Sequence, residues 1–324
     1  MPINAVQVTT RRDATNSNSL PSVFAGIVGI DNFDITRTAA AVNGAGVEFP
    51  CVGGGILSLK EAIAQSDIDW NGFCVYGEDD RVEISGSNNV NEGTIFAMPD
   101  EDNYAESQDN VYDDFDNQVI SDTWALPTLD LIDDFIADLE NEILPPGIPF
   151  SINTVVEIEK IDSADFVFNA NTLYIVEKDV TLQSNSSFSD FAVVVGEDIT
   201  MASNSTIENV VLMSNQKITF QSNNRIGFDQ PCNTPTGQFG VYVFAEDNVE
   251  FMSNNEIYGV QVATNKELKV ESNNVVVGLY AEARERASMQ SNSTYGSCGS
   301  GLGSAFGPLT GAMVPGDLKL VPVD

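Results

Sequence analysis

Carboxyl groups are the most abundant chemically active groups in this chain. Its 324 residues include 48 Asp and Glu against 14 Lys and Arg, a formal net charge of −34 at pH 7. The densest acidic run covers residues 99–150, which hold 15 Asp and Glu and no Lys or Arg. Carboxylates bind hard cations such as calcium, and in pairs they act as general acid and base. The composition therefore raises two possibilities, a calcium site and a carbohydrate-cleaving site.

The acidic run does not follow the pattern of a calcium loop. Asp100-Glu101-Asp102 starts like an EF-hand loop, but Ala105 stands where that loop needs glycine and Val111 where it needs glutamate. The chain also has no histidine, which removes the commonest metal ligand and general base. We therefore expect no cofactor and no built metal site, although weak calcium binding is compatible with the charge.

Charged side chains, and in one repeat an asparagine, recur at one position of a repeated phrase, five residues before its serine. They are Asp179, Asp198, Lys217, Asn248, Glu267 and Arg286. Lys266, Arg284 and Arg286 would line a groove beside Asp247 and Glu267, which is the basis for an alternative hypothesis: a β-helix carbohydrate-active enzyme, either a polysaccharide lyase or a glycoside hydrolase. A solvated ladder of alternating charge is the simpler interpretation, so no catalytic residue is predicted.

Four cysteines allow three pairings. Cys51 and Cys74 flank one short segment, whereas Cys232 and Cys298 both lie in loops rich in glycine or proline. We favour the disulfides Cys51–Cys74 and Cys232–Cys298, formed in an oxidising compartment. A zinc site is the competing idea, but neither a Cys-x-x-Cys spacing nor a histidine supports it.

The elements that would position these groups are set by a repeat over residues 180–295. An apolar-x-apolar-x-Ser-Asn phrase returns six times, with its serines separated by 19, 19, 31, 19 and 19 residues, the long step being 19 plus a 12-residue insertion. A fixed period of this kind is typical of a repeat architecture. The Ser-Asn pairs are Ser184-Asn185, Ser203-Asn204, Ser222-Asn223, Ser253-Asn254, Ser272-Asn273 and Ser291-Asn292.

The alternation within each phrase predicts a short strand with one buried side. The Ser-Asn pair then predicts a turn, because both residues form local hydrogen bonds with the backbone. Two or three short strands in 19 residues fit one rung of a parallel β-helix, in which equivalent residues of neighbouring rungs lie about 4.8 Å apart. We therefore predict an all-β fold, a right-handed parallel β-helix with a ladder of turn asparagines. A β-sandwich is less consistent with a constant period.

The rest of the chain divides around this repeat. Residues 73–88 closely echo residues 191–204, which predicts an earlier rung. We predict an N-terminal strand-helix-strand segment over residues 1–50 and a β-helix domain over residues 51–324. That domain would contain the acidic insertion 99–150, a C-terminal cap 296–324 and a short helix over residues 57–64. Within the insertion, the first half is expected to be an exposed loop, and apolar residues at helical spacing predict a helix over residues 128–144.

The charge also limits the partners of the protein. Nucleic acid and anionic membrane surfaces bind positive protein surfaces, so neither is expected here. The longest nearly apolar run, residues 20–30, is too short to cross a bilayer. Glycans, cations and basic protein surfaces remain compatible with the composition.

Two parts of the chain resemble a known family. Residues 4–42, with Pro21, Ser22, Phe24, Gly29 and Ile30, are similar to the segment after the membrane helix in TadE/TadG-like proteins of the tight-adherence (Tad, Flp) pilus system. Residues 50–59 and 72–89 and the Ser-Asn rungs resemble the body of larger members. The resemblance implies a bacterial protein of the cell surface or periplasm with pilus or envelope proteins as partners. It supplies no catalytic residue and no metal motif.

Members of that family usually begin with a hydrophobic helix, which this sequence lacks. We therefore expect a membrane anchor in a full-length form and none in the present chain. The function expected from the sequence is non-enzymatic: an exported structural or adhesive component associated with Tad-type pilus assembly. The carbohydrate-active enzyme remains the alternative.

Overall fold

The structure is a computed structural model in which the chain forms two compact units, residues 1–48 with 311–324 and residues 49–310. It describes the backbone of residues 5–12, 20–21, 32–33 and 35–42, and it describes residues 53–298 except 108, 125, 127, 142–149, 162–165 and 233–238. In the first unit, β1 (Ala5–Arg12) pairs antiparallel with β4 (Ile35–Val42), and β2 (Leu20–Pro21) pairs with β3 (Asn32–Phe33). Strands thus occur where the sequence predicted them, whereas most of the apolar segment 20–30 lies outside the described residues.

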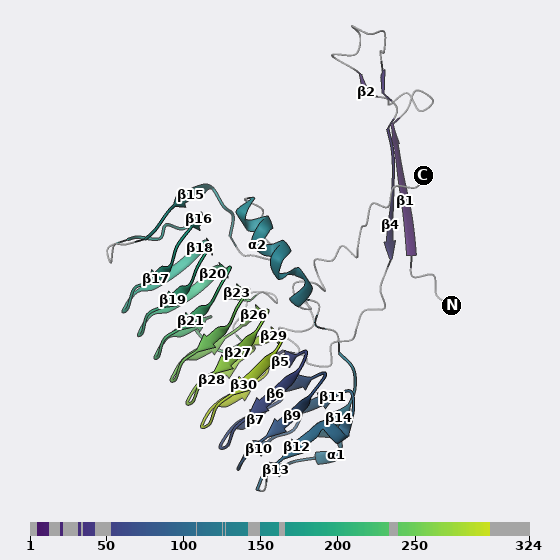
Figure 1. Ribbon diagram of the computed structural model, residues 1–324, viewed down its shortest axis with the longest axis vertical. Coiled ribbons are helices and arrows are strands. Elements are labelled where there is room, and N and C mark those ends of the chain that lie inside the picture. Colours follow the sequence, from purple (N-terminus) through teal and green to yellow (C-terminus); the bar gives the residue numbers. More distant parts are fainter. Residues whose placement is uncertain are drawn as a thin grey trace. The chain divides into compact units, whose positions relative to one another are not determined.

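The second unit is a parallel β-solenoid, which confirms the predicted fold class (Figure 1). One side is a nine-stranded sheet, here called the charged face. In spatial order its strands are β12 (Tyr104–Glu106), β9 (Arg81–Ile84), β6 (Glu61–Ala64), β30 (Arg286–Met289), β27 (Glu267–Val270), β24 (Val249–Phe251), β21 (Ile218–Phe220), β19 (Ile199–Met201) and β17 (Val180–Leu182).

An 18-stranded sheet forms the other two sides. The side covered by a helix, here called the helix face, contains β15 (Thr154–Ile158), β16 (Thr172–Val176), β18 (Ser187–Val195), β20 (Thr206–Ser214), β23 (Val241–Ala245), β26 (Val260–Thr264), β29 (Tyr280–Ala283), β5 (Gly55–Ser58), β8 (Cys74–Gly77), β11 (Ile95–Met98) and β14 (Val119–Ser121). The third side, here called the open face, contains the first residues of β18 and β20 and then β22 (Arg225–Gly227), β25 (Glu256–Tyr258), β28 (Val275–Val277), β31 (Thr294–Gly296), β7 (Asp69–Asn71), β10 (Asn89–Val90) and β13 (Val111–Tyr112).

The core of the solenoid follows from the alternation seen in the sequence. In β17, Val180 and Leu182 are fully buried, and Thr181 between them is exposed. The same pattern places Phe220 directly on Phe251, with ring centroids 4.7 Å apart. Because each rung repeats the pattern, the inward side chains form one continuous apolar core along the solenoid.

The order of the rungs in space differs from their order along the chain. The chain enters at β5 and winds to β14 at one end, and a connecting segment then leads to β15 at the other end. From there it winds back until β29, β30 and β31 pair with β5, β6 and β7, for example Tyr280 with Gly55. The last repeated rung therefore lies against the first one in the middle of the solenoid, at a junction here called the seam.

The connecting segment carries the helix predicted from the apolar spacing. After η4 (Leu129–Leu131), helix α2 (Ile132–Glu140) packs on β18 and β23 (Figure 1). Its apolar side is buried at Ile132, Phe135, Ile136 and Leu139, and Phe135 contacts Phe244 with ring centroids 5.3 Å apart. The acidic residues of α2, Asp133, Asp134, Asp138 and Glu140, are exposed to solvent.

Two predictions about the segments before α2 are wrong. Residues 57–64 form strands β5 and β6 rather than a short helix, because their alternation continues the two buried sheet patterns. Residues 101–121 are not an exposed loop but a further rung, with η3 (Glu101–Asn103), β12, β13, α1 (Phe115–Gln118) and β14. The strands of this rung are short and rich in acidic residues, so the alternation of apolar and polar residues did not predict them.

Aromatic side chains cover both ends of the solenoid. At the β14 end, Phe115 of α1 lies edge-on against Tyr112, with ring centroids 5.0 Å apart, and against Tyr104 at 6.1 Å. At the β15 end, Phe168 stacks on Phe191 with centroids 4.7 Å apart and contacts Tyr174 at 5.0 Å. These clusters cover apolar core that an open end of the stack would leave exposed.

The side-chain ladder at the turns is formed by the residues after the predicted asparagines. Asn224, Asn255 and Asn274 are at most 2% exposed. The backbone N–H of Asn224 donates to Asn255 Oδ1 at 2.8 Å, and that of Asn255 donates to Asn274 Oδ1 at 2.6 Å. Ser205, Ser293 and Asn88 occupy the same position in other rungs. The predicted ladder position was therefore one residue too early.

The predicted asparagines have a different structural role. Their backbone is left-handed in every repeat, with φ between 57° and 64° for Asn185, Asn204, Asn223, Asn254, Asn273 and Asn292. Asparagine tolerates this conformation better than most residues. Their N–H groups bond to the serine carbonyl of the next rung, for example Asn254 to Ser272 at 3.3 Å. The Ser-Asn pairs thus form a backbone ladder at the corner between the charged face and the open face.

No helix among the described residues is long and apolar enough to cross a membrane.

Candidate functional site

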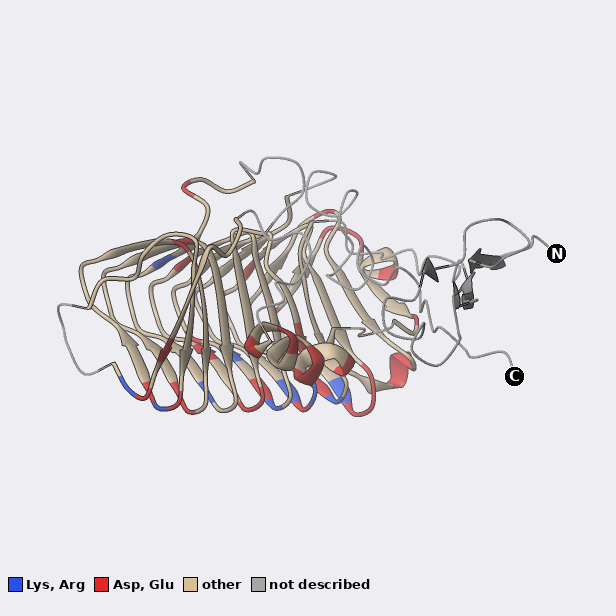
Figure 2. Ribbon diagram, turned by 90° about the horizontal axis from the view of Figure 1, so that it is seen from above, with Lys and Arg blue, Asp and Glu red and all other residues tan. Residues whose placement is uncertain are grey.

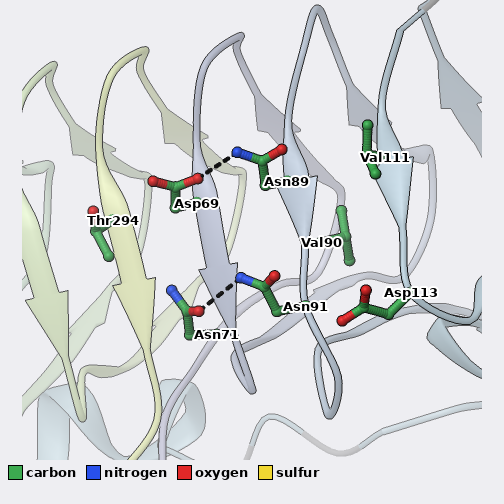
Figure 3. A pocket seen from close by; sticks show the side chains of 8 residues that line it. All are labelled: Asp69, Asn71, Asn89, Val90, Asn91, Val111, Asp113 and Thr294. Carbon is green, nitrogen blue, oxygen red and sulfur yellow. Dashed lines mark hydrogen bonds between the residues drawn. The ribbon is translucent and has the colours of Figure 1, made fainter.

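A shallow hollow of about 340 Å³ lies on the open face where the seam rungs meet (Figure 3). Outward side chains of β31, β7, β10 and β13 and of the residues just after them form it, above the buried Val90. We call it the seam hollow, and it is lined by Asp69, Asn71, Asn89, Val90, Asn91, Val111, Asp113 and Thr294. Because strands pair Thr294 with Asp69, Asp69 with Asn89 and Asn89 with Val111, these four residues form one row across the hollow.

Hydrogen bonds between neighbouring rungs fix the amides of the seam hollow. Asn89 Nδ2 donates to Asp69 Oδ1 at 2.7 Å, and Asn91 Nδ2 donates to Asn71 Oδ1 at 2.7 Å (Figure 3). Asp113 Oδ2 accepts from the backbone N–H of Glu92 at 2.8 Å. Asp69, Asn71, Asn89, Asn91 and Asp113 thus each use one polar atom in a hydrogen bond within the chain. The second polar atom of each side chain is left for a ligand.

The core beneath the hollow holds these rungs in place. Trp70 and Tyr295, which alternate with the lining residues on β7 and β31, point inward and are fully buried. Trp70 also contacts Phe96 edge-on, with ring centroids 5.5 Å apart. Asp69, Asn71, Asn89 and Thr294 therefore project from strands of the sheet, and Asn91 and Asp113 follow directly after strands. Placement on such elements favours a pre-organised binding surface.

Sequence reasoning did not single out the residues of the seam hollow. The available signal was composition: Asp69-Trp70-Asn71 and Asn89-Val90-Asn91 are strands with Asp or Asn at every outward position. These residue types are depleted in strands, so their recurrence favours a role other than stability. The proximity of these residues to Thr294 could not be predicted, because it depends on the order of the rungs in space.

Four of the five charged residues of the predicted groove, Lys266, Asp247, Arg284 and Arg286, have partners within the chain. Lys266 Nζ lies 3.0 Å from Asp247 Oδ1. Arg286 is ion-paired with Glu61 across the seam, and Glu61 also contacts Arg81 at 3.7 Å. Asp179, Asp198 and Asn248 each accept a backbone N–H from the next rung at 3.0–3.1 Å. The groove is therefore a ladder of structural contacts.

Further ion pairs extend this ladder over the charged face. Lys269 lies 3.0 Å from Glu250 and 2.8 Å from Glu271, and Lys217 lies 2.6 Å from Glu250. The pKa of the Glu250 carboxyl is lowered: burial alone would raise it, but the two lysines outweigh that effect. Figure 2 shows acidic and basic positions alternating along one edge of the solenoid. The simpler of the two interpretations of these charges fits the structure.

One buried carboxyl group anchors the connecting segment to the helix face. Glu282 is fully buried, and its Oε2 accepts the N–H groups of Thr128 at 2.8 Å and Leu129 at 3.0 Å. Tyr280 OH donates to Glu282 Oε1 at 2.7 Å. Arg284 Nη2 donates to Leu129 O at 3.0 Å. Burial raises the pKa of Glu282 to about 7, and its hydrogen bonds oppose the shift. The group acts as a structural anchor for η4.

A second carboxyl group contacts α2 directly. Glu246 is hydrogen-bonded to Asp133, and its Oε2 also accepts from Asn265 Nδ2 at 2.8 Å. Burial, and then the contact with Asp133, raise the pKa of Glu246. Paired carboxyls with a raised pKa are what a glycoside hydrolase needs. Here, however, the two groups bond to each other between α2 and the solenoid instead of facing each other across a cleft.

The calcium and cysteine predictions have different outcomes. Asp100 caps η3 by accepting the N–H of Asp102 at 3.0 Å, and among the described residues no three acidic or cysteine side chains form a group suited to a metal ion. Calcium binding stays an untested prediction. The disulfide Cys232–Cys298 is formed, as predicted. Cys74 is also disulfide-bonded, and Cys51, its predicted partner, lies outside the described residues.

Comparison with known proteins gives a family likeness without a function. A model of a domain of unknown function, DUF7867, matches residues 148–299. These residues comprise the clean repeat together with β15 and β16 at one end of the solenoid. A search of curated proteins finds no match to the chain. The match leaves out the lining residues before Thr294, so the seam hollow is only partly inside the matched region.

Proposed function

We propose that this chain is a non-enzymatic, exported bacterial surface or envelope protein that serves as a structural or adhesive component associated with Tad-type pilus assembly. The resemblance of residues 4–42 to the post-membrane segment of TadE/TadG-like proteins supports the association with a pilus. The disulfide Cys232–Cys298 supports export, because disulfides persist in oxidising compartments.

The observation that carries the non-enzymatic part is the pairing of the charged groups. Lys266 is neutralised by Asp247, Arg286 by Glu61, and Arg284 is held by Leu129 O and Asn265 Oδ1. A catalytic groove needs an acid or base within hydrogen-bond reach of a bound substrate. In this solenoid the same side chains tie one rung to the next or to the connecting segment, which suits a rigid scaffold.

Two measurements test the proposal. In the source bacterium, deletion of the gene should reduce surface attachment, and the Asp247→Asn variant should restore it as fully as the wild-type chain. The purified chain, incubated with neutral and acidic polysaccharides, should release no new reducing ends and no unsaturated products. Normal attachment after deletion would contradict the surface role, and turnover that disappears in Asp247→Asn would contradict the absence of catalysis.

The alternative, a carbohydrate-active enzyme, is favoured by one observation, the Glu246–Asp133 contact with its raised pKa. If this pair is catalytic, Glu246→Gln should abolish glycan cleavage while leaving the thermal midpoint nearly unchanged. If the pair only joins α2 to the solenoid, cleavage is absent from both chains.

A further inference from the structure

We propose that the seam hollow is a binding site for a neutral glycan, an inference that rests on the proposed adhesive role and names its ligand class. At the hollow, the outward residues of the open face differ in type from the outward residues of the other rungs. Elsewhere the outward row contains Ser187, Thr206, Arg225, Glu256 and Val275 in succession, which mix size and charge. In the seam rungs, Asp and Asn occupy both outward rows.

The atoms left to a ligand match hydroxyl groups. After the internal hydrogen bonds, Asp69 has a carboxylate oxygen left, Asn89 has its amide oxygen and Asn71 has its amide Nδ2. Thr294 adds a hydroxyl group, which both donates and accepts. A sugar hydroxyl also donates and accepts, so one ring can satisfy both kinds of atom. The rows repeat at the rung spacing of about 4.8 Å, a length close to that of one hexose unit.

The apolar part of the hollow fits the carbon face of a sugar ring. The side chain of Val111 is 61% exposed, and it lies at one end of the row that runs through Asn89 and Asp69 to Thr294. Polar atoms beside this exposed apolar side chain offer the two kinds of contact that a sugar ring can make, hydrogen bonds to its hydroxyl groups and packing against its carbon face.

Charge distinguishes a neutral glycan from an anionic one. Neither Lys nor Arg lines the hollow, and Asp69 and Asp113 contribute negative charge. A uronate or sulfated sugar would meet repulsion there, in a chain whose net charge is −34. A hydroxyl-bearing neutral sugar meets only hydrogen-bond acceptors and donors.

A metal ion or a peptide strand fits the geometry less well. Asp69 and Asp113 each use one oxygen within the chain and lie in different rows, two rungs apart. A peptide that adds a strand needs an unpaired sheet edge. Of the strands that form the hollow, β7 and β10 are already paired on both sides, so a peptide strand could be added only beyond β13, at the rim of the hollow.

The test uses the full chain and defined probes. Binding of gluco-, manno- and galacto-hexasaccharides, of a hexagalacturonate and of hexalysine is measured by isothermal titration. We expect binding to at least one neutral hexasaccharide and at least about tenfold weaker binding by the double variant Asn71→Ala/Asn91→Ala. The control Ser187→Ala/Ser189→Ala changes two outward polar residues of one distant rung and should bind like the wild-type chain. Unchanged thermal midpoints show that both variants are folded.

The outcomes separate this inference from the proposed function. Binding to none of the three neutral probes, binding of hexagalacturonate or hexalysine alone, or equal loss in both variants overturns the glycan site. The same mixtures are analysed for cleaved products. If a glycan is bound and cleaved, the non-enzymatic proposal is contradicted and the glycan site is supported. If no glycan is bound and none is cleaved, the glycan site is contradicted and the non-enzymatic proposal is unaffected.

Discussion

Tyr295 stacks on Trp70, with ring centroids 4.8 Å apart and planes inclined by 20°, although one belongs to the last repeated rung and the other to the first. Both side chains are fully buried. Phe73 closes the group at 5.3 Å from Tyr295. This contact lies directly beneath the seam hollow, so the packing of the two rungs also fixes the position of its polar side chains.

Truncation at the seam should be costly. Tyr295→Ala removes a fully buried ring and leaves a cavity beside Trp70, so we expect the free energy of unfolding to fall by about 3–5 kcal/mol. Val275→Ala changes an exposed residue of the adjacent rung and should cost less than about 0.5 kcal/mol. Urea unfolding followed by circular dichroism measures both. Similar losses in the two variants would mean that the seam does not contribute to the stability of the stack.

The two adjacent turn asparagines should respond differently to substitution. Asn255→Leu removes the acceptor for Asn224 N–H and the donor to Met252 O, which leaves buried backbone groups unpaired at a cost of about 2–4 kcal/mol in unfolding free energy. Asn254→Ala strains a left-handed residue and should cost about 1 kcal/mol.

The matched control for this pair is Asn254→Gly, which should be nearly neutral because glycine adopts the same backbone conformation without strain. Urea unfolding midpoints for the three variants rank them by their loss of stability. If Asn254→Ala is as damaging as Asn255→Leu, the side-chain ladder is not the main stabilising element of the turn.

Glu282 should make stability depend on pH. Its pKa rises from 4.5 to about 7 on folding, mainly because it is buried. The folded chain therefore favours the protonated form, and the resulting stabilisation is complete below about pH 4.5 and is lost as the pH rises to about 7. The loss amounts to up to about 3 kcal/mol of unfolding free energy.

The isosteric variant Glu282→Gln keeps an oxygen for the N–H groups of Thr128 and Leu129 but does not titrate. Its unfolding free energy relative to the wild-type chain should therefore increase between pH 5 and pH 8. Comparing the two chains cancels the general effect of the negative charge on stability. Parallel pH profiles would show that Glu282 does not titrate in this range.

The disulfide should stabilise the rungs that it joins. Cys232 and Cys298 are 66 residues apart, so the cross-link restricts a long loop of the unfolded chain. The chain-entropy relation gives a contribution of up to about 4 kcal/mol. Cys232→Ser/Cys298→Ser should lower the thermal midpoint, and a reducing agent should lower it in the wild-type chain. A midpoint unchanged by the double substitution would contradict this expectation.

The sequence was informative wherever the stack repeats itself. The 19-residue period was enough to predict the parallel solenoid, the inward residues such as Val180 and Leu182, and the presence of an insertion between Ser222 and Ser253. It did not predict which rung lies beside which, because all rungs share one pattern. The similarity between residues 73–88 and 191–204 therefore indicated that residues 73–88 form a rung. It did not indicate which rungs lie on either side of that one.

The candidate site was missed for the same physical reason. Thr294 and Asp69 become neighbours only through the seam, and no local pattern records that pairing. The ladder error at Asn254 and Asn255 has a local cause: both are turn residues of one type, and only the left-handed φ of Asn254 turns the next side chain inward. Likewise, the strands of residues 101–121 are too short and too acidic to predict.

The seam also determines how the protein responds to mechanical load. Both described ends of the solenoid chain leave from the seam, where Cys298 N–H donates to Gly53 O at 3.0 Å. Tension applied through either terminus therefore enters in the middle of the stack, and the two tips carry none of it. A rung at a tip cannot be peeled away until the seam has parted. Cys298 is covalently joined to Cys232 in that region, so the first point under tension is also a cross-linked one.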